Sequence, residues 1–133
     1  MIYTSQSIAL ACLETMVHLA GKEPLPMNRY LVRIDVPAEV WATAIPFDHS
    51  NNVGWDAVPQ GKTSLDWGSD WVARGSSCLA RVPSVVVPEE FNVLINPLHK
   101  DKQKLKTMKL RKWGYDVRAQ SPLLNHPVQS LQT

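Results

Sequence analysis

Apolar residues recur at helical spacing between Ser7 and Leu19, near the start of the chain. At about 100° per residue they fill one broad arc, which predicts an amphipathic helix whose arc faces the core. Glu14 lies at the border of this arc, one turn before His18, so we expect its carboxylate to be half-buried. Ser5 or Ser7 can cap the start of the helix. The arc consists of Ile8, Ala9, Cys12, Leu13, Met16, Val17 and Leu19, with Leu10 at its edge.

Most of the remaining chain is predicted to form short strands. Tyr30–Val36 alternates apolar and polar residues, as a half-buried strand does. Residues 63–73 predict a second helix with Trp67 and Trp71 on one face, whereas residues 41–61 predict a long irregular loop. Further strands are expected at 1–3, 79–88, 91–97, 104–111 and 113–118. Several strands with few helices predict an α+β fold with a mixed or antiparallel sheet.

Composition restricts the class of protein. A chain of 133 residues with 44% hydrophobic and 20% charged residues suits one globular domain. No apolar run reaches the roughly 20 residues that span a membrane, and no positive charge precedes the first apolar stretch as in a signal peptide. Cys12 and Cys78 lack the spacing of metal ligands. We therefore expect a cytoplasmic protein with reduced cysteines, no membrane segment and no bound metal.

Five segments stand in an order that carries a family resemblance. They are Ile2–Leu19, Tyr30–Val36, Val82–Pro88, Asn92–His99 and Tyr115–Arg118. Together they resemble the RES domain, which is named for an arginine, a glutamate and a serine. This domain is the toxin half of bacterial Xre–RES toxin–antitoxin modules.

The resemblance implies a fold similar to that of ADP-ribosyltransferases and a reaction that consumes NAD⁺. The family breaks the nicotinamide–ribose bond of NAD⁺, its substrate, and passes the ADP-ribosyl group to water, phosphate or a protein. It also implies an Xre-type antitoxin protein as a partner. The signature glutamate falls on Glu14 and the serine on Ser84. Tyr3 and Asn96 are expected to contact NAD⁺, with Asn92 as a further candidate.

Elementary chemistry fits these roles. Loss of nicotinamide develops positive charge on the ribose, which a fixed carboxylate such as Glu14 stabilises. Ser84 suits hydrogen bonding to a substrate better than covalent attack, because no base lies near it in the sequence. His18 or His99 could approach it in space.

One signature residue has no counterpart in this sequence. The family's arginine, expected to grip the pyrophosphate of NAD⁺, lies upstream of the strand that contains Tyr3. We expect residues 1–118 to form a RES-like domain truncated at its N-terminus relative to the family, followed by a flexible tail at 119–133. Arg33 or Arg118 could reach the site instead.

Plainer interpretations stay open. Glu14 can pair with His18 on the helix surface, Ser84 can be a turn residue after Pro83, and Asn-Pro is a common turn initiator. The chain can also be an inactive RES-like protein that only binds an antitoxin.

A basic run raises nucleic-acid binding as another alternative. Residues 100–112 carry seven basic residues against one acidic residue, and Trp113 and Tyr115 follow and could stack on bases. We favour an edge strand, because lysines on an edge discourage aggregation between sheets. The run is also interrupted, as by core contacts, at Leu105, Met108 and Leu110.

Overall fold

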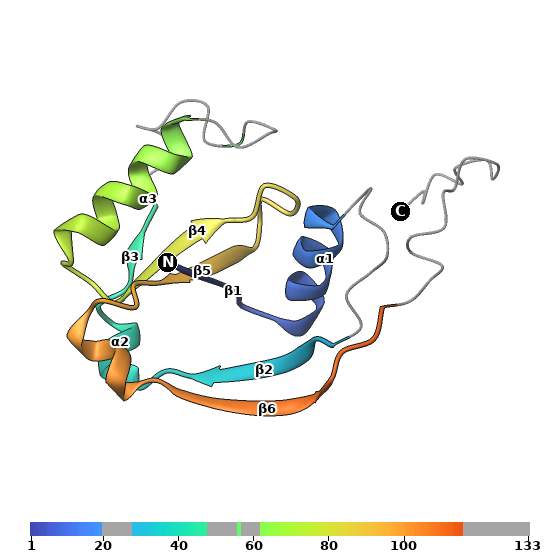
Figure 1. Cartoon of the computed structure of the whole chain (residues 1–133). Coiled ribbons are helices and arrows are strands. Elements are labelled where there is room, and N and C mark those ends of the chain that lie inside the picture. The colour runs from blue at the N-terminus through green and yellow to red at the C-terminus, as the bar shows by residue number, and fades with distance from the viewer. Residues whose placement is uncertain (20–27, 48–55, 57–61, 116–133) are drawn as a thin grey trace.

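The computed structural model describes residues 1–19, 28–47, 56 and 62–115, without the side chains of 62–65. Four strands form one sheet in the order β1-β5-β4-β3 (Figure 1). They are β1 (Ile2–Ser5), β5 (Phe91–Ile95), β4 (Leu79–Pro83) and β3 (Ile45–Pro46). β1, β5 and β4 pair antiparallel, whereas β3 runs parallel to β4. This mixed sheet with few helices confirms the α+β prediction. In the described part of the chain, no helix is long and apolar enough to cross a membrane.

The sheet carries a separate apolar core on each face. We call the side that packs against α3 (Lys62–Arg74) the α3 face. Its core is formed by Phe47, Trp71, Ala80, Val82 and Leu94. The opposite face packs against α2 (Ala38–Trp41), and its buried core is formed by Val40, Cys78, Leu79, Val93 and Ile95. Residues that pair in register across a sheet share one face. Tyr3 pairs with Leu94 and Asn92 pairs with Val82, so Tyr3 and Asn92 lie on the α3 face. Ser5 pairs with Asn92 and lies on the same face.

A two-stranded antiparallel ribbon lies below the sheet in Figure 1. It pairs β2 (Tyr30–Asp35) with β6 (Lys106–Lys112), and the short 3₁₀ helix η1 (Lys100–Lys104) precedes β6. Leu105 packs against the core as predicted. The same prediction is wrong for Met108, which is 50% exposed, and for Leu110, which is also exposed. Every residue of β6 is exposed, so these two positions have no core beneath them.

Three predicted segments differ from the structure. The expected loop at 41–61 contains the last residue of α2 and the strand β3, while 48–55 and 57–61 lie outside the described residues. The expected strand at 79–88 ends at Pro83. Residues 113–115 form no strand, and 116–118 lie outside the described residues.

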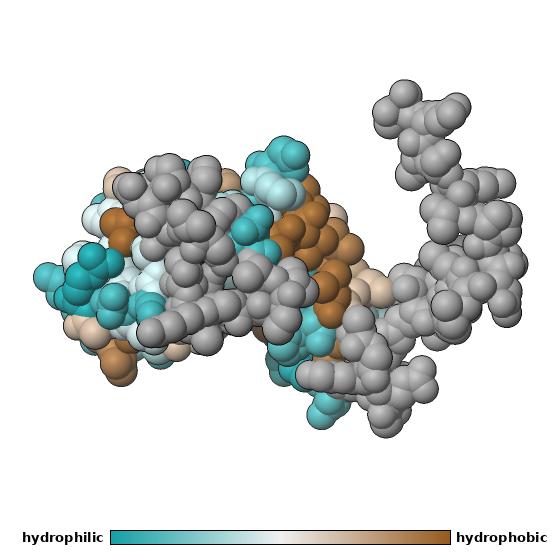
Figure 2. Space-filling model, turned by 90° about the horizontal axis from the view of Figure 1, so that it is seen from above, coloured by the Kyte–Doolittle hydropathy of each residue, from teal (hydrophilic) through white to brown (hydrophobic). Residues whose placement is uncertain are grey.

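The first helix, α1 (Ile8–His18), forms as predicted but turns a different side inward. Ser7 caps it, since its side chain accepts a hydrogen bond from the backbone N–H of Leu10 at 3.1 Å. Leu10 is buried, whereas Ile8 and Val17 of the expected inward arc are 52% and 51% exposed. Figure 2 shows apolar side chains gathered where α1 lies in Figure 1. The helix is apolar around most of its circumference, so spacing alone does not identify its buried side. The half-burial of Glu14 is confirmed.

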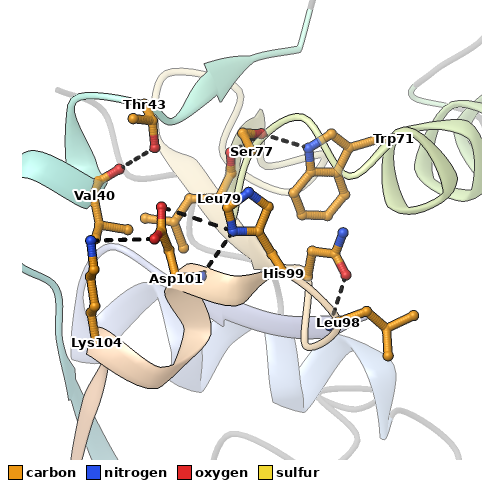
Figure 3. Close-up of polar contacts among 10 residues, drawn as sticks. Val40, Thr43, Trp71, Ser77, Leu79, Leu98, His99, Asp101 and Lys104 are labelled. Atoms are coloured by element: carbon orange, nitrogen blue, oxygen red, sulfur yellow. Dashed lines mark hydrogen bonds and ion pairs between the residues drawn. The ribbon is translucent and has the colours of Figure 1, made fainter.

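A polar cluster at the end of β4 that is remote from α1 secures α3 and η1 (Figure 3). The buried indole N–H of Trp71 donates to Ser77 Oγ at 2.9 Å, and Ser77 in turn donates to the carbonyl of Leu79 at 3.0 Å. The side chain of His99 accepts a hydrogen bond from the backbone N–H of Asp101. The Asp101 carboxylate also pairs with Lys104. These contacts involve His99 in the start of η1, so it does not serve as a base for Ser84.

Candidate active site

Glu14 lies at the centre of the candidate site, where α1 meets the sheet. Its Oε1 accepts a hydrogen bond from Ser84 Oγ at 2.5 Å and another from Asn92 Nδ2 at 2.9 Å. Ser84 follows β4, and Asn92 is the second residue of β5. A helix near the start of the chain and two consecutive strands, at separations of 70 and 78 residues from Glu14, therefore meet at one carboxylate oxygen. Glu14 has these partners rather than the His18 pairing left open above.

Ser84 occupies this place because of the turn that follows β4. Its Oγ accepts hydrogen bonds from the backbone N–H groups of Val86 and Val87, at 3.1 and 3.0 Å. A serine whose hydroxyl accepts hydrogen bonds from the backbone N–H groups two and three residues ahead forms a compact turn. These N–H groups then cannot pair with a neighbouring strand. The strand consequently ends at Pro83, and the Ser84 hydroxyl, which is fully buried, keeps its one proton for Glu14.

The two asparagines of β5 and its following turn have different surroundings. Asn92 donates to Glu14, and its Oδ1 accepts from Ser5 Oγ at 2.7 Å. Asn96 lies about 13 Å further along the strand direction, four residues on. Its buried amide bonds only to backbone, donating to the carbonyl of Val72 and accepting from the N–H of Leu98. The structure thus brings Asn92, and not Asn96, to Glu14.

Tyr3 lies on the α3 face, two residues before Ser5 along β1. Its side chain is 59% exposed. Partial burial raises the pKa of the Tyr3 phenol above its ordinary value of 10.0, and the negative charge of Glu14 adds to the increase. Tyr3 is thus a largely exposed aromatic ring on the same sheet face as Asn92.

The α3 face is hollowed between β1 and α3. A depression of about 370 Å³ is lined by Met1, Gly68, Ser69, Val72 and Ala73. A Cβ on Gly68 would approach Met1 Cε to 3.1 Å, so the glycine allows the two elements to come together closely. None of these five lining residues carries a charge.

The arginines expected as substitutes for the family's signature residue do not meet Glu14 in the described structure. Arg33 Nε pairs with Asp35 Oδ1 at 3.0 Å on the exposed ribbon. Arg118 lies outside the described residues. Within the described residues there is also no group of three His, Cys, Asp or Glu side chains placed to hold a metal ion.

Sequence reasoning placed the glutamate and the serine but missed Ser5. No motif singled it out, apart from its possible capping of α1. The available signal was alternation, which places residues 3 and 5 on one face, but the pairing of β1 with β5 is needed to bring Ser5 to Asn92.

Comparisons with known proteins identify the family. The RES domain matches residues 1–118. The chain is 52% identical over 118 residues to the Prs ADP-ribosylating toxin of Sphingobium sp. (strain YBL2), covering 88% of this chain and 73% of that protein. It is 36% identical over 102 residues to a Toxin Res of Yersinia enterocolitica, covering 77% of this chain and 65% of that protein. A Toxin Res of Photorhabdus laumondii is 33% identical over 122 residues, covering 88% and 74% of the two chains. The chain belongs to the RES domain family.

Proposed function

We propose that this chain is an NAD⁺-consuming toxin of a toxin–antitoxin system, which cleaves the nicotinamide–ribose bond. The observation that carries the proposal is the carboxylate of Glu14, held by two donors on one oxygen beside the α3 face. The relatives named as toxins, one of them an ADP-ribosylating toxin, support it.

The proposed reaction depends on stabilising the positive charge that develops on the ribose. As the bond to nicotinamide breaks, its electron pair leaves with the nicotinamide and the ribose carbon becomes positive. Glu14 stabilises this developing charge and then assists the incoming water, phosphate oxygen or protein side chain. A carboxylate that is already fixed needs no reorganisation during the reaction, which is the main source of its benefit.

We assign Ser84 to the orientation of Glu14 rather than to direct contact with NAD⁺. Its hydroxyl already donates one hydrogen bond and accepts two, which uses the bonding capacity of a serine. Tyr3 keeps its proposed contact with NAD⁺, since more than half of its surface is exposed beside the Glu14 charge. Asn96 is not retained in the proposed site, because both ends of its amide bond to backbone.

The proposed partner is an Xre-type antitoxin, and the proposed location is the cytoplasm, where NAD⁺ is available. The exposed apolar side chains of α1 and of the neighbouring turn suit contact with a protein. They are Ile8, Leu13, Val17, Val85 and Val86.

The test is the loss of NAD⁺ and the release of free nicotinamide by the purified chain, with and without phosphate. We expect turnover that Glu14→Gln abolishes, since the amide keeps the shape but not the charge. Glu39→Gln is the matched control, because Glu39 is an exposed glutamate in the first turn of α2. A folded sample without turnover would contradict the proposed reaction. Full activity in Glu14→Gln would remove Glu14 from the mechanism.

A further inference from the structure

A chain of side-chain hydrogen bonds runs across the sheet to Glu14. Ser5 Oγ lies 2.7 Å from Asn92 Oδ1, and Asn92 Nδ2 lies 2.9 Å from Glu14 Oε1. Ser5 and Asn92 are register partners on β1 and β5, so their side chains share the α3 face. These hydrogen bonds therefore join β1, β5 and α1 through one buried amide.

The Glu14 carboxylate determines which group donates and which accepts in each of these hydrogen bonds. An ionised carboxylate only accepts hydrogen bonds, so the NH₂ end of Asn92 must face Glu14. The carbonyl end of Asn92 then faces Ser5, whose hydroxyl must donate. Ser5 thus holds the amide in the one orientation that serves Glu14.

Both donors bind the same oxygen of Glu14. Ser84 and Asn92 reach Oε1, and Oε2 makes no hydrogen bond within the described part of the chain. Two donors from different strands fix the carboxylate at one oxygen and leave the other for a reacting partner. Asn92 itself is buried, so its effect on a substrate passes through Glu14.

We propose that Asn92, oriented by Ser5, is a positioning residue that fixes the Glu14 carboxylate for cleavage of the nicotinamide–ribose bond. This inference rests on the proposed function. A carboxylate freed from this amide would turn toward water, and its stabilisation of the ribose cation would weaken. Since Asn92 does not reach the substrate, its loss acts on kcat and not on the KM for NAD⁺.

The experiment compares Asn92→Leu and Ser5→Ala with the unmodified chain in steady-state NAD⁺ cleavage. Asn92→Leu is close to Asn92 in shape and removes the donor to Glu14 without adding a second acidic group. We expect its kcat to fall about tenfold or more while KM changes by less than about twofold, and Ser5→Ala to show the same pattern more weakly. Thr4→Val is the matched control, because the Thr4 hydroxyl donates to the carbonyl of Val93 and takes no part in the hydrogen bonds that join Ser5, Asn92 and Glu14.

The outcomes separate this inference from the proposed function. Turnover by the unmodified chain with an unchanged kcat in Asn92→Leu overturns the positioning role and leaves the reaction standing. A raised KM with unchanged kcat overturns it as well, since it indicates substrate contact. If Asn92→Leu does not fold, Ser5→Ala at its half-buried position decides: a lowered kcat at unchanged KM supports the role, and an unchanged kcat overturns it. No turnover by the folded, unmodified chain overturns the proposed function, and the positioning role falls with it.

Discussion

Ser84 and Glu14 stand 70 positions apart in the chain, yet Ser84 Oγ donates to Glu14 Oε1 at 2.5 Å. The same oxygen of Ser84 accepts two backbone N–H groups from the turn that follows it. Hydrogen bonds in series polarise one another, so the two N–H donors make the hydroxyl a stronger donor to the carboxylate. A turn at the end of one strand thereby supports a charge carried by a distant helix.

Ser84→Ala is expected to reduce both stability and activity. It removes a donor from Glu14 and leaves two backbone N–H groups without their acceptor, at a cost of about 1–3 kcal/mol in the free energy of unfolding. Denaturant unfolding and NAD⁺ turnover measure the two effects. Ser77→Ala is the matched control, since Ser77 is a buried serine that bonds to Trp71 and not to Glu14. It should lose comparable stability while the kcat of the folded protein is kept. Equal losses of kcat in both variants would contradict a specific role for Ser84.

The Tyr3 phenol should titrate above its ordinary value and respond to Glu14. Partial burial, followed by the charge of Glu14, raises the pKa of Tyr3 above 10.0. The folded protein therefore holds this proton more tightly than the unfolded chain does. The resulting stabilisation is complete below about pH 10 and is lost as the pH rises through the folded-state pKa.

Two variants test this coupling by the ultraviolet absorbance of tyrosinate. Glu14→Gln should move the Tyr3 titration to lower pH, because a negative neighbour is removed. Tyr3→Phe identifies which of the tyrosine signals belongs to Tyr3, and it should weaken the alkaline loss of stability. An unmoved titration in Glu14→Gln would show that Glu14 does not act on Tyr3.

The two cysteines should differ sharply in reactivity. Cys78 is fully buried, and burial, with a smaller contribution from the Asp101 charge, raises the pKa of its thiol. The thiolate is the reactive form, so alkylation of native protein should label Cys12 first, since Cys12 is only half-buried. Mass spectrometry of labelled peptides gives the order. Labelling of Cys78 before unfolding would indicate that the core around β4 opens.

Trp71→Phe should destabilise the protein more than Trp67→Phe does. Trp71 is fully buried with its N–H bonded to Ser77, and its replacement leaves a cavity and an unpaired buried oxygen. Trp67 is half-buried and stacks on Trp71 with ring centroids 6.2 Å apart. We expect a difference of about 1–2 kcal/mol in thermal or denaturant unfolding. Equal effects would indicate that the α3 face is repacked.

The basic ribbon is not expected to bind single-stranded nucleic acid. Lys109 Nζ lies 4.2 Å from the Tyr30 ring centroid, and the Arg111 guanidinium lies 5.1 Å from that of Trp113. One face of each of these rings is thus covered by the protein's own cation, which leaves less aromatic surface for stacking on bases. Filter binding at low salt should show no retention. Retention that falls steeply with salt would instead support the nucleic-acid alternative.

Local pattern was sufficient for several elements but not for singling out the candidate site residues. Ser7 and the helix formers after it predicted α1, and alternation predicted β2, because both signals lie within a few residues of each other. The resemblance singled out Glu14 and Ser84 from five segments. The end of β4 was missed because it depends on where the Ser84 side chain bonds.

By itself, the sequence determined the α+β class, the capped helix that carries Glu14, and membership of a family with a glutamate and a serine at these positions. The tertiary structure decided which side of α1 faces the sheet, that Asn92 rather than Asn96 meets Glu14, and that Ser5 belongs to the same hydrogen-bond chain. The reason is that periodicity describes each element about its own axis. Strand register and helix docking, which depend on contacts between residues far apart in sequence, determine which polar side chains satisfy one another.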